Sequence, residues 1–215
     1  MEKKLTKNNL YKIWNKVPKD YYQKGVQNNL LQKIWHKNKI EQAKKIIKNL
    51  PFHKCLDVGC ASGYMISEIA AMYTNATFFG VDVYDKAIKY AKIKYPHIKF
   101  YLSPAEKMPF KNNSFDLIIS YETIEHVENP EGFLLEIKRI LKKNGIFILA
   151  MDSGNLLFKV VWYFWENTTG KVWQGAHLNA YHHAQLEKLV KDLGFKVQKK
   201  IFTHFGMEVV LVLKK

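Results

Sequence analysis

The sequence comprises 215 residues, of which 47% are hydrophobic and 14% aromatic, so general disorder is excluded and one domain with a sizeable core is expected. The 34 basic residues outnumber the 19 acidic residues, which gives a formal net charge of +15. Such an excess suits an acidic partner, either nucleic acid or an anionic membrane surface, or it reflects a proteome that is rich in lysine.

The sequence also bears on where the protein works. Residues 1–7 lack the apolar stretch of a signal peptide, and no apolar run approaches the roughly 20 residues that span a bilayer. The two cysteines, Cys55 and Cys60, fall in a predicted strand and turn, so we expect free, buried thiols in a reducing compartment. We therefore expect a cytoplasmic protein that is at most peripheral to the inner face of a membrane.

Residues 1–50 are rich in Lys and Asn and show no strand-like alternation. Their apolar residues recur at helical spacing as far as Pro51, which predicts an N-terminal helical extension over one end of a sheet. The aromatic residues of this extension would form a lid over a ligand or pack on the core; they are Tyr11, Trp14, Tyr21, Tyr22 and Trp35.

From Cys55 onward, apolar strands alternate with segments of helical spacing. We expect parallel strands at 54–59, 76–82, 98–102, 115–121 and 146–150, helices at 62–73, 85–94, 130–142 and 181–193, and an antiparallel pair at 195–197 and 207–213. This order predicts an α/β fold with a doubly wound, mainly parallel seven-stranded sheet and helices on both faces. The expected organisation is an extension at 1–50 and one domain at 51–215, which carries an insertion at 151–179.

The segment from Asp57 to Gly63 joins the first of these strands to its helix. Gly59 permits a tight turn, and Gly63 lets the helix start close to the strand. A strand, glycine turn and helix hold a nucleotide-like ligand in open α/β sheets, yet neither G-x-G-x-x-G nor a P-loop is present. Asp82 ends the next strand, 19 residues beyond Gly63, where a carboxylate can bind the hydroxyl groups of a ribose.

The spacing Asp57-x-Gly59-x-x-x-Gly63 resembles motif I of the class I methyltransferases, which use S-adenosylmethionine (SAM). Residues 103–110 resemble the adenine-contacting segment of that family, although Pro104 stands where an Asp is usual. The segments 115–130 and 139–145 resemble the small-molecule branch, which includes the ubiquinone-biosynthesis O-methyltransferases. The resemblance implies SAM as cofactor and assigns its contacts to Asp57, Gly59, Cys60, Ala61, Gly63, Asp82, Val83, Ala105, Glu106 and Tyr121.

Glu122, Glu125 and His126 follow the fourth strand at spacings that place them on one face if the segment is helical. The pattern resembles the metal site of ubiquinone-pathway O-methyltransferases and of small-RNA 2′-O-methyltransferases, in which a later histidine, here His177, completes the site. The resemblance implies these four catalytic residues and Mg²⁺, with Mn²⁺ or Zn²⁺ also compatible. The alternative is a metal-free site in which His126 is a base or a structural hydrogen-bonding group.

Residues 155–165 are densely apolar and aromatic but too short to span a bilayer. They would lie in a membrane interface with Lys159 and Lys171 at the edge, wall an apolar pocket, or join the core.

We therefore expect a methyltransferase that modifies a small, apolar or lipid-like acceptor, most simply at oxygen. An RNA methyltransferase acting on tRNA or RNA ends would suit the charge. However, the fourth strand ends in Ser-Tyr-Glu-Thr rather than in the Asn/Asp-Pro-Pro-aromatic motif of amino-directed nucleic-acid enzymes. A non-catalytic SAM-binding protein and an oxidoreductase on a related sheet are the remaining alternatives.

Overall fold

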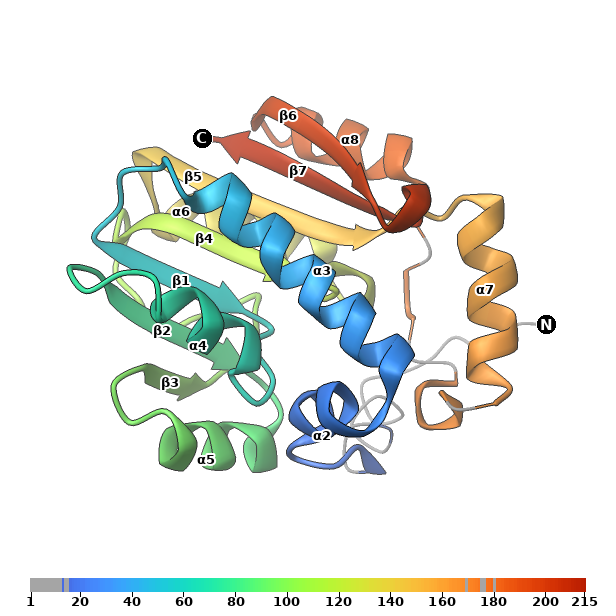
Figure 1. Cartoon of the computed structure of the whole chain (residues 1–215). Helices are drawn as coiled ribbons and strands as arrows, with labels where there is room; N and C mark the ends of the chain where they lie inside the picture. Colours follow the sequence, from blue (N-terminus) through green and yellow to red (C-terminus); the bar gives the residue numbers. More distant parts are fainter. Residues whose placement is uncertain (1–12, 14–15, 169, 175–176, 180) are drawn as a thin grey trace.

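A twisted seven-stranded sheet forms the centre of the computed structural model, which describes residues 13, 16–168, 170–174, 177–179 and 181–215 (Figure 1). The strands lie in the order β3-β2-β1-β4-β5-β7-β6, and only β7 runs antiparallel to its neighbours. The predicted fold class is confirmed. The strands are β1 Lys54–Val58, β2 Thr77–Asp82, β3 Lys99–Leu102, β4 Phe115–Tyr121, β5 Leu141–Asp152, β6 Lys196–Thr203 and β7 Glu208–Lys214.

Helices cover both faces of the sheet, and each face has its own half of the core. Side chains of α3, α4 and α5 pack on one face, and those of α6 and α8 pack on the other. The described helices are α2 Tyr21–Asn28, α3 Leu30–Ile47, α4 Tyr64–Ala70, α5 Asp85–Lys94, α6 Pro130–Ile140, α7 Leu156–Glu166 and α8 His183–Asp192, with short 3₁₀ helices η1 Ile124–His126, η2 Lys171–Trp173 and η3 His204–Gly206.

The alternation of side chains along β1 places the first functional carboxylate. Leu56 and Val58 belong to the core half under α6 and α8, whereas Cys55 belongs to the half under α3 and α4. Because successive side chains of a strand point to opposite faces, Asp57 shares the face of Cys55. The strand therefore delivers one carboxylate to the α3 side of the sheet, at its carboxyl end.

Several predicted boundaries differ from the structure; β5, for example, spans Leu141–Asp152 rather than 146–150, and β6 spans Lys196–Thr203 rather than 195–197. The helix expected at 130–142 ends at Ile140, and β5 already begins at Leu141, so Asn144 and Gly145 lie within that strand. The helix expected at 62–73 is the shorter α4, which begins after Gly63. Within the described residues, none of the helices combines the length and the apolar character needed to cross a bilayer.

Candidate functional site

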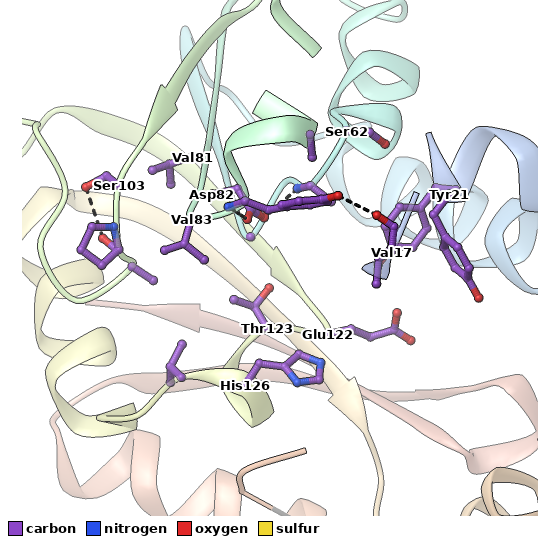
Figure 2. A pocket seen from close by; sticks show the side chains of 18 of the residues that line it. Val17, Tyr21, Ser62, Val81, Asp82, Val83, Ser103, Glu122, Thr123 and His126 are labelled. Atoms are coloured by element: carbon purple, nitrogen blue, oxygen red, sulfur yellow. Dashed lines mark hydrogen bonds between the residues drawn. The ribbon is translucent and has the colours of Figure 1, made fainter. Parts of the chain in front are cut away.

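A cavity of about 140 Å³ lies at the carboxyl ends of β1, β2 and β4 (Figure 2). In Figure 2, Asp82, Ser103, Thr123 and His126 surround it, and Val17 and Tyr21 approach it from the N-terminal segment. A second cavity, of about 50 Å³, adjoins it on the α3 side. Four residues line both cavities, so the two lie on either side of the same side chains; they are Tyr22, Gly59, Ala61 and Glu122.

The turn after β1 requires its glycines for two different reasons. Gly59 has a φ of 79°, and a Cβ at this position would collide with the side chain of Thr123. Gly63 has a φ of 74°, and a Cβ there would lie 2.6 Å from the ring of Phe100. Gly63 thus sets the packing of the turn against the sheet and lines neither cavity.

Asp82 is fixed by backbone groups at the wall of the larger cavity. Its Oδ2 accepts a hydrogen bond from the N–H of Ala61 and its Oδ1 accepts one from the N–H of Tyr84, each at 2.8 Å. Burial raises the pKa of Asp82, and these hydrogen bonds oppose that shift. Each carboxylate oxygen still has acceptor capacity for a ligand hydroxyl. Val83, the next residue, also lines the cavity.

Asp57 lies in the smaller cavity, beside Cys60 and Tyr121. Its side chain is buried, and within the described part of the chain no ion pair reaches it. Burial, and then the nearby charge of Asp82, raise the pKa of Asp57 to about 8. A cation bound in the smaller cavity would restore the ionised carboxylate.

The loop after β3 forms the opposite wall of the larger cavity. Pro104, Ala105 and Glu106 all line it, as the resemblance implied for the last two. The hydroxyl of Ser103 donates a hydrogen bond to the carbonyl of Lys107 at 2.7 Å, which holds this loop in a compact turn.

Glu122 does not share a helical face with Glu125 and His126, so that expectation was wrong. The N–H of Glu122 still bonds to the carbonyl of Ala150, which extends the β4–β5 pairing, and its φ is 50°. Only the three residues of η1 remain to form a helical turn. The carboxylate of Glu122 turns instead to Lys39 of α3, at 2.5 Å.

Lys39 is a functional candidate that the sequence did not single out. It is buried, and its ammonium group also lies 3.6 Å from Glu208. Burial alone would raise the pKa of Glu122, but the charge and hydrogen bond of Lys39 lower it to about 2. Glu122 is therefore ionised at the junction of the two cavities.

Glu125, His126 and His177 form a separate cluster, whose ligand atoms lie within 4.8 Å of one another. The N–H groups of Leu178 and Asn179 donate to the carbonyl of Glu125, at 2.9 and 3.0 Å, and this brings the loop that carries His177 to η1. Glu125 is buried, and its Oε2 lacks a hydrogen-bond partner among the described residues.

Electrostatics within this cluster favour uncharged groups. Burial, and then the charge of Asp152, raise the pKa of Glu125 well above its usual range. Burial, and then His126, lower the pKa of His177 to about 4, so its imidazole is neutral at physiological pH. A neutral imidazole is the form that binds metal ions.

Helix α7 borders the cluster with aromatic rings. The ring of Trp162 stacks on that of His177 with centroids 4.6 Å apart, and Phe158 stacks at 6.5 Å. Because no residue of α7 is buried, the interpretation that this segment belongs to the core was wrong. One stripe of the helix instead packs on His177 of the histidine cluster.

The N-terminal segment covers the larger cavity. The hydroxyl of Tyr84 donates to the carbonyl of Val17 at 2.6 Å, and the hydroxyl of Ser62 donates to Gln23 at 2.9 Å. Of the predicted lid aromatics, Tyr21 and Tyr22 line the cavity. Trp35 packs on His204, and Tyr11 and Trp14 lie outside the described residues.

Residues 56–149, which run from within β1 to within β5, match a family model described as a methyltransferase domain. This part of the chain is a methyltransferase domain. It includes the glycine turn, Asp82, the loop after β3 and the Glu125–His126 pair. Among solved structures, the domain resembles a SAM-dependent methyltransferase from Thermotoga maritima, described as a possible histamine N-methyltransferase, with a TM-score of 0.68 and 22% identity over 96% of this chain and 99% of that one.

Curated relatives match this domain over part of their length. The ubiquinone biosynthesis O-methyltransferase of Pelagibacter ubique is 32% identical over 115 residues, which are 52% of this chain and 46% of that protein. The human mitochondrial arginine-hydroxylase NDUFAF5 is 34% identical over 116 residues, which are 54% of this chain and 32% of that protein. The chain thus spans less than half the length of these two relatives, and their names denote different reactions.

Proposed function

We propose that the protein is a SAM-dependent methyltransferase that acts on a small, apolar or lipid-like acceptor, at an oxygen atom. The observation that carries this proposal is the placement of Asp82. Two backbone N–H groups aim its carboxylate at a cavity that lies between the glycine turn and the loop after β3. This is the strand end at which open α/β sheets bind the ribose of a nucleoside ligand.

The residues present fit SAM, which would supply a methyl group on a sulfonium cation. Asp82 would accept hydrogen bonds from the ribose hydroxyls, and the buried carboxylate of Asp57 would face the ammonium group of the methionine part. The backbone of Ala105 would approach the adenine, with Val83 and Glu106 beside it. The part of SAM near the smaller cavity would contact Gly59, Cys60, Ala61 and Tyr121. Gly63 would keep the turn close to the sheet.

The acceptor would lie between η1 and α7. Phe158 and Trp162 offer it aromatic surface beside His177, and His126 lies at both the larger cavity and the histidine pair. An oxygen nucleophile must lose its proton as it attacks, and in a site without a metal ion His126 would accept that proton. Alignment of the oxygen with the transferred methyl group would supply much of the rate, because positioning alone can contribute several kcal/mol.

We also infer that Glu125, His126 and His177 hold a divalent cation, with Glu122 outside the ligand set because Lys39 neutralises it. The unpartnered Oε2 of Glu125 and the neutral imidazole of His177 suit ligation. Mg²⁺ prefers oxygen ligands, so two imidazoles favour Mn²⁺ or Zn²⁺ over the Mg²⁺ expected from the sequence. Such an ion would lower the pKa of an acceptor hydroxyl bound to it.

A nucleic-acid acceptor is the weaker alternative. The net charge of +15 favours it, but among the described residues Lys19 is the one Lys or Arg that lines the larger cavity. Its acidic lining residues are Asp82, Glu106, Glu122 and Glu128. A polyanion would meet like charges there.

The organisation and location predicted from the sequence remain part of the proposal. Residues 1–50 would act as a helical extension that covers the cofactor, and 51–215 would form the methyltransferase domain with its insertion at 151–179. The protein would work in the cytoplasm, where residues 155–165 would touch the inner face of a membrane.

Transfer of a labelled methyl group from SAM tests the proposed reaction. The protein is incubated with a lipid extract and, in parallel, with bulk tRNA, and both fractions are counted. We expect label in the lipid fraction with the unaltered protein and much less label with Asp82→Ala. Label in the tRNA fraction alone would contradict the proposed acceptor class.

A further inference from the structure

Three elements that are far apart in the sequence, α7, η3 and the start of α3, lie on the same side of the molecule (Figure 1), and each carries exposed large apolar side chains. Tyr163 and Phe164 of α7 are more than 60% exposed, Phe205 of η3 is 95% exposed, and Leu30 and Leu31 of α3 are more than 70% exposed. We call the exposed sides of α7, η3 and the N-terminal turns of α3 the docking face.

Hydrogen bonds and ring contacts tie these elements together. The side-chain N–H of Asn155, at the start of α7, donates to the carbonyl of Gly206 at 2.7 Å. His204 lies beside Trp35 of α3, with the ring centroids 4.0 Å apart and its Nε2 3.1 Å from the carbonyl of Trp35. The docking face is therefore one built surface.

The backbone of η3 is strained at the residues that expose the ring of Phe205. His204 and Phe205 have φ values of 50° and 57°, a region in which residues other than glycine are strained. The buried Glu208 holds this turn in place, because its carboxylate accepts a hydrogen bond from the hydroxyl of Thr203 and lies 3.2 Å from Nδ1 of His204. A strained turn that presents a fully exposed aromatic ring indicates a contact surface.

The exposed lysines of the docking face favour an anionic partner. Lys159 follows Leu156 by three residues and precedes Tyr163 by four, so all three lie on one side of α7. Lys33 and Lys37 are exposed on α3 beside Leu30 and Ile34. Glu166, the last residue of α7, is the one acidic residue in the ranges 30–40, 156–166 and 202–207. Pairing two copies of this face would bring lysines together, whereas anionic head groups would complement them.

We propose that the docking face binds the surface of an anionic lipid bilayer, with its apolar side chains in the head-group region and its lysines at the phosphates. Lysine stems allow this geometry, because they can lie along apolar surface while the ammonium groups stay in water. The inner stripe of α7, which contains Phe158 and Trp162, packs on His177, so the helix would lie between the bilayer and the histidine cluster. This last step rests on the proposed apolar acceptor.

Co-sedimentation of the full chain with vesicles tests the proposal, using phosphatidylcholine alone or mixed with phosphatidylglycerol. The variant Phe164→Ser/Phe205→Asn removes two exposed rings, and Asn tolerates the left-handed backbone at 205. Ile93→Ser on α5 is the matched control, because Ile93 is 84% exposed on another part of the surface. Thermal unfolding verifies that both variants fold.

We expect the unaltered protein and Ile93→Ser to bind the phosphatidylglycerol vesicles, less so at high salt, and the double variant to bind at least about tenfold more weakly. No binding to either vesicle, or equal binding to both at all salt concentrations, would overturn the proposal. So would a dimer, seen by light scattering, that the double variant dissociates. Because the assay contains neither SAM nor acceptor, failure of the proposed reaction would leave its result unchanged.

Discussion

Lys39, which is buried, and Glu122, which is half-buried, form an ion pair that joins the N-terminal helix α3 to the end of β4, with 2.5 Å between nitrogen and oxygen. Glu208, at the start of β7, lies 3.6 Å from the same ammonium group. The ammonium group of Lys39 thus lies close to two carboxylates, which come from separate strands of the sheet. It also fixes a side chain that lines both cavities.

Lys39→Met should lower the free energy of unfolding by about 3–5 kcal/mol, because it leaves the carboxylates of Glu122 and Glu208 without the positive charge between them. The double variant Lys39→Met/Glu122→Gln should recover part of this loss. Urea unfolding of the single and double variants gives the coupling. Additive effects of the two substitutions would contradict a direct pair.

The same pair predicts an acid-sensitive contribution to stability. Lys39 lowers the pKa of Glu122 from 4.5 to about 2, so the pair stabilises the protein fully above pH 4.5 and loses its effect as the pH falls towards 2. Urea unfolding at pH 5 and at pH 3 measures this effect. Between these two pH values the free energy of unfolding should decrease less in Glu122→Gln than in the unaltered protein.

Asp82→Ala should weaken SAM binding at least about tenfold, because each charge-assisted hydrogen bond to the ribose contributes roughly 1.5–3 kcal/mol. Calorimetric titration measures the affinity. Asp85→Ala is the control, since Asp85 pairs with Lys89 on the surface of α5 and does not line the cavity. Equal affinity in both variants would place the ribose elsewhere.

SAM affinity should rise with pH up to about 8 and then level off. Burial keeps Asp57 protonated below its pKa of about 8, and a cationic ammonium group binds its ionised form. In titrations at pH 6, 7, 8 and 9, the affinity for SAM should increase at most tenfold per pH unit below pH 8. Binding in this range should also release a proton. Asp57→Asn should lose this dependence; a flat profile in the unaltered protein would exclude Asp57 from the ammonium site.

Without SAM, the same carboxyl group should make stability fall as the pH rises. Between the usual pKa of 3.8 and about 8, native Asp57 retains a proton that the unfolded chain releases, so its contribution lowers the free energy of unfolding as the pH increases. Comparison of the unaltered protein with Asp57→Asn at pH 5 and pH 8 isolates this effect.

Chelation should abolish methyl transfer but leave SAM binding nearly unchanged, because the histidine cluster is separate from Asp82 and Asp57. Mn²⁺ should restore activity more fully than Mg²⁺, given two imidazole ligands. His177→Ala should bind Mn²⁺ at least about tenfold more weakly by calorimetry. Full activity after exhaustive chelation would leave His126 as a base without a metal.

The sheet could be predicted because its signals are local. Apolar strands such as 115–121 alternate with helical spacing, and glycines occupy turns whose φ values are positive. The position of Asp82 follows from the same order, since it ends a strand next to the glycine turn. These features depend on neighbours in sequence and on parallel pairing, which the alternation already implies.

The role of Lys39 could not be predicted, because it is one lysine among many in a helical segment and its partners come from β4 and β7. The arrangement of Glu122 was mispredicted for a related reason. Helical spacing was assumed from 122 onward, but backbone pairing to Ala150 continues through Glu122 and redirects its side chain. Only tertiary pairing determines where that strand ends.

The identity of the ligand that binds in the cavity beside Asp82 tests the proposed function most directly. Calorimetric titration of the unaltered protein with SAM and, separately, with NAD⁺ decides it. We predict one equivalent of SAM bound, an affinity reduced at least about tenfold in Asp82→Ala, and no heat of binding with NAD⁺. Binding of NAD⁺ in place of SAM, or SAM binding that Asp82→Ala leaves intact, would contradict the proposed cofactor site.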